Sequence, residues 1–282
     1  MTDTPGDGAI PLADPVAAAA VPAPAFADPR SATPVLAAAG LGYSYRRGIP
    51  TIEDISFEVH EGINLAIVGE SGAGKTTILR LLLGLATPTT GSVLFDGNAL
   101  RRDRLSLRRF RRSVQAVFQD PYSSLDPRQR VGRIIAEPLR SLNVRGEIPT
   151  AVAQALAAVD LPADAATRYP HEFSGGQRQR IAIARALAPS PRVLLADEPV
   201  SALDVSTRVR IVDLLASLSS SVTVVLVSHD LGVVAALCQQ TVVLERGRIV
   251  EQGDTGGMLR SPRHPYTQAL LDSVPRLDGL AG

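Results

Sequence analysis

Cysteine, lysine and long apolar runs are almost or wholly missing from this 282-residue sequence. Its single cysteine, Cys238, excludes a disulfide within the chain and a multi-cysteine metal site, and such usage fits a reducing compartment. No stretch reaches the roughly 18 uncharged apolar residues that a membrane-spanning helix needs. Residues 1–8 carry Asp3 and Asp7 instead of the basic segment of a secretory signal. We therefore expect a soluble protein that could act at a membrane only through partner chains.

The charge balance gives little support for nucleic-acid binding, since the formal net charge is only +1. Arginine supplies 28 of the 29 basic residues, a bias typical of a GC-rich genome, and Lys75 is the only lysine. A lysine kept against that bias indicates a position that arginine does not fill. A compact ammonium fits inside a tight phosphate-binding loop, whereas a planar guanidinium needs more room.

The chain is long and apolar enough, with 45% hydrophobic residues, for one large domain with a subdomain. Residues 1–34 hold seven of the 21 prolines and show no apolar periodicity, so we expect a disordered tail there. Residues 35–255 are expected to form the main domain, with a helical subdomain inserted at about 120–188. Residues 256–282 are expected to form a C-terminal extension.

Short apolar runs indicate two kinds of β-structure. Paired runs with turn residues between them predict antiparallel strands; they are Val35–Tyr45 with Thr51–Val59 about Arg47-Gly48, Ser92–Leu100 about Asp96-Gly97, and Thr241–Glu245 with Arg248–Glu251. Continuous buried runs that alternate with helices predict a parallel α/β sheet covered on both faces. These runs are Ile63–Val68, Val114–Phe118, Arg192–Ala196 and Val222–Val227, and the helices are Thr76–Leu85, Val131–Leu139, Ala151–Val159 and Gly176–Leu187.

A glycine-rich loop joins the first of these buried runs to the first helix. It reads Gly-Glu-Ser-Gly-Ala-Gly-Lys-Thr, the phosphate-binding pattern in the strand–loop–helix context that it requires. Its N–H groups and the helix N-terminus can surround the β- and γ-phosphates of a nucleotide. Lys75 can bridge those phosphates, and the Thr76 hydroxyl can bind Mg²⁺. The predicted nucleotide contacts are Gly69, Ser71, Gly72, Gly74, Lys75, Thr76 and Thr77. Kinases, GTPases and transporters all share such a loop.

Two adjacent carboxylates, Asp197 and Glu198, follow the apolar run Arg192–Ala196. The run brings them to the C-terminal edge of the sheet, where open α/β folds bind their ligands. Asp197 can hold Mg²⁺ directly or through water. Glu198 can accept a proton from an attacking water, so we predict that it is the general base.

A second anion-binding segment is Phe173-Ser174-Gly175-Gly176-Gln177, in which Ser-Gly-Gly opens a helix. One nucleotide does not need two such cradles from one chain, so the sequence indicates a dimer in which each chain's second cradle faces the nucleotide of the other. Here the chain resembles the ABC transporter ATPases, whose signature usually reads Leu-Ser-Gly-Gly-Gln, with Phe173 in place of the leucine. The resemblance runs from about residue 35 to residue 275.

The resemblance implies a P-loop NTPase (RecA-like) fold with a parallel-sheet core, an N-terminal antiparallel β subdomain and an inserted helical subdomain. It also implies roles for several further residues. Gln119 resembles the glutamine that contacts Mg²⁺ or water and senses the membrane subunit. His229 resembles the switch histidine at the γ-phosphate, and Ser201–Asp204 the loop that crosses the dimer interface. Tyr45 resembles the aromatic residue that stacks on adenine, with Tyr43 as the alternative.

Two further segments, Phe118–Pro127 and His264–Leu271, resemble the ATPases of oligopeptide, dipeptide and nickel importers. This resemblance implies ATP and Mg²⁺ as cofactors, a place on the cytoplasmic face of the cell membrane, and three kinds of partner. The partners are transmembrane permease subunits, a second ATPase chain in a homodimer or heterodimer, and a substrate-binding protein. Many relatives bind an iron–sulfur cluster through C-terminal cysteines, which this chain lacks, so we predict no cluster.

Two other functions stay open at this point. The motor of an ABC exporter is one, because substrate choice resides in the partner chains. A non-transport ABC ATPase of DNA repair or translation is the other, although such proteins usually need a long coiled coil, zinc cysteines or two cassettes in one chain, and none is visible here.

The segment Arg101–Arg112 has seven arginines and one acid, Asp103. With Phe110 as its only aromatic residue, it favours a solvated helix face over phospholipid or permease contact and over a nucleic-acid patch.

Overall fold

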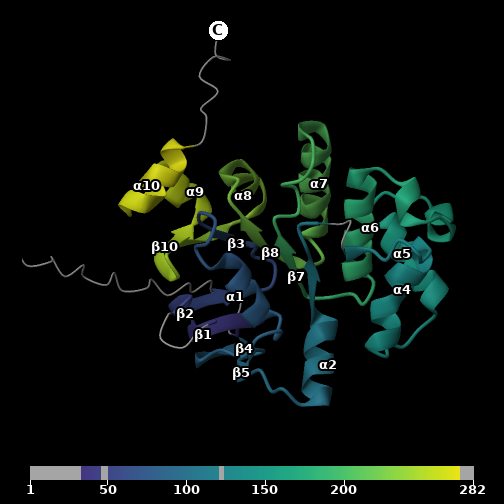
Figure 1. Cartoon of the computed structure of the whole chain (residues 1–282), viewed down its shortest axis with the longest axis horizontal. Coiled ribbons are helices and arrows are strands. Elements are labelled where there is room, and N and C mark those ends of the chain that lie inside the picture. Colours follow the sequence, from purple (N-terminus) through teal and green to yellow (C-terminus); the bar gives the residue numbers. More distant parts are fainter. Residues whose placement is uncertain (1–32, 46–49, 121–123, 274–282) are drawn as a thin grey trace, which may run out of the picture.

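The computed structural model describes residues 33–45, 50–120 and 124–273, and they form two sheets with helices around them (Figure 1). Most of the predicted disordered tail and the predicted turn at Arg47-Gly48 lie outside the described residues. No helix in the described ranges combines the length and the apolar character needed to cross a membrane.

The larger sheet has six strands in the order β10-β9-β3-β8-β7-β6. Strands β3, β6, β7, β8 and β9 run parallel to one another, and β10 pairs antiparallel with β9. Their bounds are β3 Leu65–Val68, β6 Val114–Val117, β7 Val193–Asp197, β8 Thr223–Ser228, β9 Gln240–Glu245 and β10 Arg248–Asp254. Every residue of β3 and β8 is buried, as expected for parallel strands covered on both faces. The predicted parallel α/β sheet is confirmed.

The smaller sheet is antiparallel, with strand order β2-β1-β4-β5. Its strands are β1 Leu36–Tyr43, β2 Ile52–Val59, β4 Thr90–Phe95 and β5 Asn98–Ala99. The predicted turn between β4 and β5 is present, with φ of +50° at Asp96 and +72° at Gly97. Two consecutive positive φ values match the tight hairpin turn that the Asp-Gly pair favours.

Helix α1, Lys75–Leu82, lies between the two sheets, and its Ile78, Leu79, Leu81 and Leu82 are fully buried. It shares one apolar core with the smaller sheet and with alternate residues of the larger sheet, such as Val193 and Leu195 of β7. The helix was predicted to continue to residue 85. It ends earlier because the chain turns at Gly84, whose φ is +64°.

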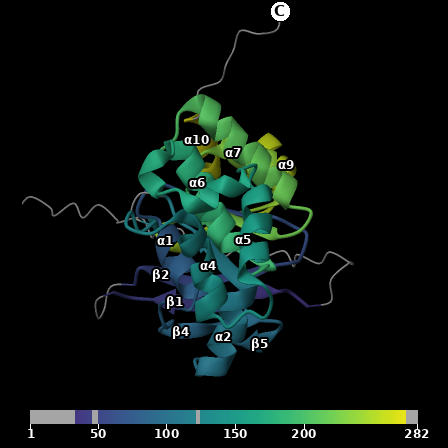
Figure 2. The same cartoon turned by 90° about the vertical axis from the view of Figure 1, so that its right-hand side faces the viewer.

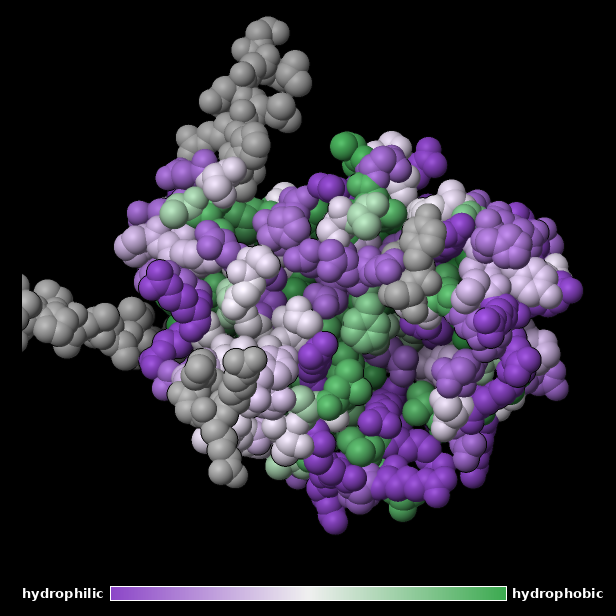
Figure 3. Space-filling view, viewed as in Figure 1, coloured by the Kyte–Doolittle hydropathy of each residue, from purple (hydrophilic) through white to green (hydrophobic). Residues whose placement is uncertain are grey.

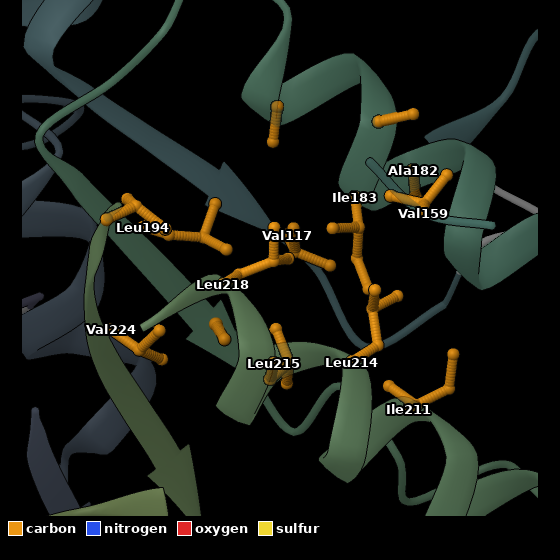
Figure 4. Close-up of a cluster of buried hydrophobic side chains, with 14 of the residues drawn as sticks. Val117, Val159, Ala182, Ile183, Leu194, Ile211, Leu214, Leu215, Leu218 and Val224 are labelled. Carbon is orange, nitrogen blue, oxygen red and sulfur yellow. The ribbon is translucent and has the colours of Figure 1, made fainter. Parts of the chain in front are cut away.

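The opposite face of the larger sheet packs against a second core. Leu194 and Ala196 of β7 point to it, alternating with the residues that face α1. Helix α7, Val205–Leu218, lies along this face, and Figure 4 shows its Leu218 beside Val117 and its Leu214 beside Ile183. The other helices of this side are α6 Gly175–Leu187, α8 Leu231–Leu237, α9 Thr255–Arg260 and α10 Pro265–Asp272.

A helical layer stands beside the sheet between β6 and β7 in the chain, as Figure 2 shows from its own side. It contains α4 Val131–Ser141, α5 Ile148–Ala157, the short 3₁₀ segments Ala163–Thr167 and Pro170–Glu172, and α6. The predicted fold class, including an inserted helical subdomain, is confirmed.

The arginine-rich segment forms α2, Arg104–Ser113. Phe110 is fully buried and meets Phe95 edge to face, with ring centroids 5.3 Å apart. Most of its arginines are exposed, and strongly hydrophilic side chains cover the lower end of the molecule in Figure 3. Because the one aromatic side chain is unavailable for stacking on a base, the interpretation as a solvated helix face gains support over a nucleic-acid patch.

Candidate functional site

Four predicted segments meet at one edge of the larger sheet because four neighbouring parallel strands end there (Figure 1). Gly69 follows β3, Gln119 follows β6, Asp197 ends β7 and His229 follows β8. The register aligns these ends, since Val68 pairs with Ser228 and Asp197 with Val227. Residues that are up to 160 positions apart in the chain thus face a common space.

The phosphate loop, Gly69–Thr76, requires glycine at positions that approach other backbone. A Cβ at Gly69 would lie 2.3 Å from the Leu244 carbonyl oxygen, closer than any real contact. Gly74 precedes α1 with φ of +108°, and no side chain caps the helix. The first N–H groups of α1 therefore have no side-chain acceptor and can bind an anion.

Lys75 points back into the loop rather than out to solvent and is only 7% exposed. Its Nζ donates to the carbonyl oxygens of Gly69 at 2.7 Å and Glu70 at 2.9 Å. An ammonium has three N–H donors, so one stays available for a phosphate oxygen. Burial lowers the pKa of Lys75, while the carboxylates of Glu198, Asp197 and Glu70 act in the opposite direction.

The remaining predicted loop residues divide into exposed and buried ones. Ser71, Gly72 and Thr76 are exposed, whereas Thr77 is buried. The Thr77 hydroxyl lies 3.2 Å from the hydroxyl of Tyr45. The polar side of the loop therefore faces the open space, and its second threonine ties the loop to the end of β1.

Tyr45 is 55% exposed beside this loop, and its ring meets that of Tyr43 edge to face at 5.0 Å. Tyr43 itself is partly buried against the core. The exposed ring next to the loop is therefore that of Tyr45, which favours it as an aromatic platform; the choice between the two tyrosines stays a prediction. Arg80, one turn after Thr76 on α1, donates to the Tyr45 hydroxyl at 3.3 Å and was not predicted as a site residue.

The two adjacent acids differ in environment and backbone conformation. Burial, and then the charge of Glu198, raise the pKa of Asp197, opposed by Lys75 and Arg80. Glu198 has a φ of +44°, a left-handed conformation that a non-glycine residue adopts only under constraint. Its N–H donates to the Val227 carbonyl at 2.9 Å, and its carbonyl accepts the Ser201 hydroxyl at 3.1 Å.

His229 closes the site on its outer side. Its Nδ1 lies 3.1 Å from Glu198 Oε1, and its side chain is 62% exposed while that of Glu198 is 18% exposed. A carboxylate held by strained backbone beside an imidazole can accept a proton from water and have its orientation fixed by the ring.

The donors predicted for Mg²⁺ are the hydroxyl of Thr76, the carboxylate of Asp197 and the amide of Gln119, which is exposed after β6. Within the described ranges, no three His, Cys, Asp or Glu side chains gather as a metal site of their own. A magnesium ion at a nucleotide keeps waters and phosphate oxygens as ligands, so one or two protein oxygens suffice. Burial is the main cause of the raised pKa of Asp197, and the charge of Glu198 adds to it. A cation would offset these adjacent negative charges, so these residues fit the ion.

The second cradle lies against α7. Ser174 caps α6, its Oγ accepting the Gln177 N–H at 3.3 Å while Gln177 Oε1 accepts the Ser174 N–H at 2.9 Å. A Cβ at Gly176 would lie 2.3 Å from Thr207 Cγ2, and one at Gly175 would meet Leu203 Cδ2 at 3.9 Å.

The loop that precedes α7 ends at Asp204, whose carboxylate caps that helix. Hydrogen bonds from the Ser206 hydroxyl and the Thr207 N–H lower the pKa of Asp204 to about 2. The structure thus brings the residues around Ser174 together with the loop that ends at Asp204, and brings the phosphate loop together with Asp197, Glu198 and His229.

Comparison with known proteins finds matches along most of the chain. Residues 52–201 match the family described as ABC transporter, and residues 250–282 match the C-terminal region of oligopeptide/dipeptide transporters. A putative peptide import ATP-binding protein of Brucella ovis is 44% identical over 254 residues, covering 87% of this chain and 80% of that protein. The dipeptide transport ATP-binding protein DppF of Escherichia coli is 44% identical over 241 residues, covering 84% and 72%.

A dimeric ATP-binding cassette solved in a post-hydrolysis state with ADP and phosphate has a similar structure. It superposes with a TM-score of 0.69 at 29% identity, covering 78% of this chain and 98% of that chain.

Proposed function

This chain belongs to the ATP-binding subunits of ABC transporters, which hydrolyse ATP, and we propose that it uses that hydrolysis to drive the import of peptides or a related small solute such as nickel. The observation that carries the proposal is the match of residues 250–282 to the C-terminal region of oligopeptide/dipeptide transporters. That region lies beyond the part of the chain that matches ABC transporters in general, so it bears on the kind of transporter.

The phosphate loop holds the β- and γ-phosphates with the N–H groups at the start of α1 and with the free donor of Lys75. Adenine stacks on Tyr45. Thr76, Asp197 and Gln119 would hold a magnesium ion, which would offset charge on the phosphates. These assignments are supported by the open side of the loop, by the exposed ring of Tyr45 and by the negative charge at Asp197.

Glu198 accepts the proton of the attacking water, and His229 orients its carboxylate and reaches the γ-phosphate. The constrained backbone at Glu198 supports this role, because strain of that kind gathers at reactive residues. The distance of 3.1 Å between His229 Nδ1 and Glu198 Oε1 supports the pairing of the two side chains.

The second cradle binds the γ-phosphate of a nucleotide held by another ATPase chain. In support, the capping box at the start of α6 uses the N–H groups of Ser174 and Gln177 and not those of Gly175 and Gly176. A Cβ added at either glycine would first meet Leu203 or Thr207, so this segment lies against the loop that ends at Asp204 and against α7. ATP then holds two chains together, and hydrolysis releases them. Ser174, Gly175, Gly176, Gln177 and the loop ending at Asp204 form the interface.

The chain acts at the cytoplasmic face of the membrane, bound to permease subunits and served by a substrate-binding protein. The test is transport by vesicles that contain the full chain with the permease subunits that co-purify with it. With ATP on the side of this chain, we expect labelled dipeptide to move towards that side, dependent on the binding protein. Movement of substrates only away from that side would make the chain an exporter motor. Recovery of ribosomes or DNA instead of permeases would reject a transport role.

Gln119 passes the state of the nucleotide to the permease, because it lies where the sheet meets the helical layer. Replacing Gln119 with alanine should leave the affinity for ATP nearly unchanged and weaken the stimulation of hydrolysis by the permease. Equal stimulation of the variant and the unmodified protein removes Gln119 from this role.

A further inference from the structure

A hydrogen bond joins the C-terminal extension to the phosphate loop. The Glu70 N–H donates a hydrogen bond of 2.9 Å to the hydroxyl of Tyr266, which lies on α10 and is 196 positions away in the chain. Burial raises the pKa of Tyr266, so its hydroxyl stays neutral at physiological pH and can accept this hydrogen bond.

The peptide group that Tyr266 contacts is also the one that holds the lysine. Glu70 N–H and the Gly69 carbonyl belong to the same peptide unit, which is planar. Its carbonyl accepts Lys75 Nζ at 2.7 Å, and its N–H donates to Tyr266. Since Gly69 has no side chain, its own dihedral angles leave this peptide free to rotate. Two hydrogen bonds on opposite ends of the group restrain that rotation.

Tyr266 is itself held in place by a clamp on β10. The Glu251 carboxylate accepts the N–H groups of Arg263 and His264, each at 3.0 Å. Then His264 Nδ1 accepts the Tyr266 N–H at 3.2 Å, and Pro265 starts α10. The segment His264–Leu271, which resembles peptide importers in the sequence, therefore contains both Tyr266 and the His264 side chain that accepts its N–H; most of it forms α10, labelled in Figure 1.

We propose that Tyr266 is a positioning residue for ATP hydrolysis: its hydroxyl fixes the Gly69–Glu70 peptide, whose carbonyl aims the Lys75 amine at the phosphates of ATP. Two of the three ammonium donors are used by the loop carbonyls, so the direction of the third follows from where those carbonyls point. If this peptide can rotate, the Lys75 amine is no longer held in one direction. Part of the free energy of ATP binding is then used to orient the amine again.

The test replaces Tyr266 with phenylalanine in the full chain, which keeps the ring that packs on the core. We expect KM and Kd for ATP to rise about three- to tenfold, with kcat changed by less than about twofold, because the lost hydrogen bond supports binding before and during the reaction. Hydrogen exchange at the Glu70 amide should become faster. The matched control is Ser273→Ala, which removes a hydroxyl that donates to Leu270 at the end of α10; its KM should stay at the level of the unmodified protein.

Glu251→Gln tests whether the clamp on β10 acts on the phosphate loop through Tyr266. It leaves the N–H groups of Arg263 and His264 with one good acceptor in place of two, so KM should rise in the same direction. The double variant Glu251→Gln/Tyr266→Phe should be no worse than Tyr266→Phe alone, since the clamp acts through the hydroxyl. The proposal is overturned if Tyr266→Phe keeps the KM and the Glu70 exchange rate of the unmodified protein, if Ser273→Ala shifts KM equally, or if the two substitutions add.

Discussion

Helices α1 and α6 both begin at a glycine-rich segment, yet their N-termini are built differently. At α1 no side chain caps the helix, a lysine is buried in the loop, and two carboxylates lie at the C-terminal end of β7. At α6 an ordinary capping box of Ser174 and Gln177 closes the turn, and the adjacent glycines pack on α7. The first end gathers charged groups from its own chain. The second end is capped by the neutral side chains of Ser174 and Gln177, and the negative charge proposed for it is the phosphate of a nucleotide held by another chain.

The largest effect is expected at the charged end. Glu198→Gln keeps the shape of the side chain but cannot accept a proton, so ATP hydrolysis should fall roughly 10²–10⁴-fold. ATP should still bind, and the ATP-bound dimer should accumulate in size-exclusion chromatography. Glu147→Gln, at the start of α5 where the side chain makes no cap, is the control and should hydrolyse ATP normally. Near-normal hydrolysis by Glu198→Gln would remove it as the base.

Lys75→Arg tests whether the phosphate loop at the start of α1 needs a compact cation. Lys75 is 7% exposed and its Nζ lies between two carbonyl oxygens, so a guanidinium does not fit without moving the loop. We expect hydrolysis to fall by about 10²-fold, comparable to the loss of one phosphate-stabilising donor elsewhere. The circular dichroism spectrum should be unchanged. Normal turnover with arginine would mean that charge alone matters at this position.

Mixing two inactive chains tests whether the two ends meet between molecules. Lys75→Ala loses the grip on phosphate, and Gly175→Asp places a carboxylate in the second cradle. In a mixed dimer one composite site carries both lesions and the other carries neither, so part of the ATPase activity should return. The experiment applies if the chain forms homodimers, with mixing verified by two affinity tags. If mixing is verified but ATPase activity does not return, the result would contradict ATP sites that are shared between two chains.

A matched pair of glycines tests the packing at the second end. Gly176→Ala puts a methyl group 2.3 Å from Thr207 Cγ2, and we expect a loss of about 1–3 kcal/mol in the free energy of unfolding. Gly175→Ala, whose nearest neighbour is at 3.9 Å, should change it by less than about 0.5 kcal/mol. Thr207→Ser removes the blocking methyl group and should restore part of the stability of Gly176→Ala in urea unfolding.

The smallest effect is expected at Glu251, whose carboxylate binds the N–H groups of Arg263 and His264 just before α10. Burial raises the pKa of Glu251, but the nearby Thr267 side chain and the hydrogen bonds from the N–H groups of Arg263 and His264 outweigh it, and the net pKa is lowered. A lowered carboxyl pKa contributes stability above the unfolded value of 4.5, and this stability is lost as the pH falls through the folded value. The difference in melting temperature between the unmodified protein and Glu251→Gln should therefore be largest at neutral pH. It should shrink as the pH falls below 4.5. A difference independent of pH would contradict a charged clamp.

The sequence predicted the elements that depend on local pattern. Buried strands read as continuous apolar runs, and the phosphate loop and the adjacent acids read as motifs, because their chemistry requires fixed spacing. Helix ends were less accurate, as at α1, where the positive φ of Gly84 ends the helix before the apolar pattern does.

Contacts between distant segments were not predictable in the same way. Tyr266 lay in a recognised segment, but its bond to Glu70 depends on how α10 docks on β10. The left-handed backbone of Glu198 follows from hydrogen bonds to β8 and Ser201, which no local pattern encodes. The roles of the individual site residues, and the domain boundaries, stay predictions.

The sole lysine makes the phosphate loop chemically unique in the whole chain. A lysine-specific protease can cleave the unfolded polypeptide at one bond only, after Lys75, at the first turn of α1. Because that side chain is buried in the folded protein, cleavage requires the loop to open. The rate at which two fragments of about 75 and 207 residues appear therefore measures the opening of this one loop, and nucleotides that close it should slow the cut without any label being attached.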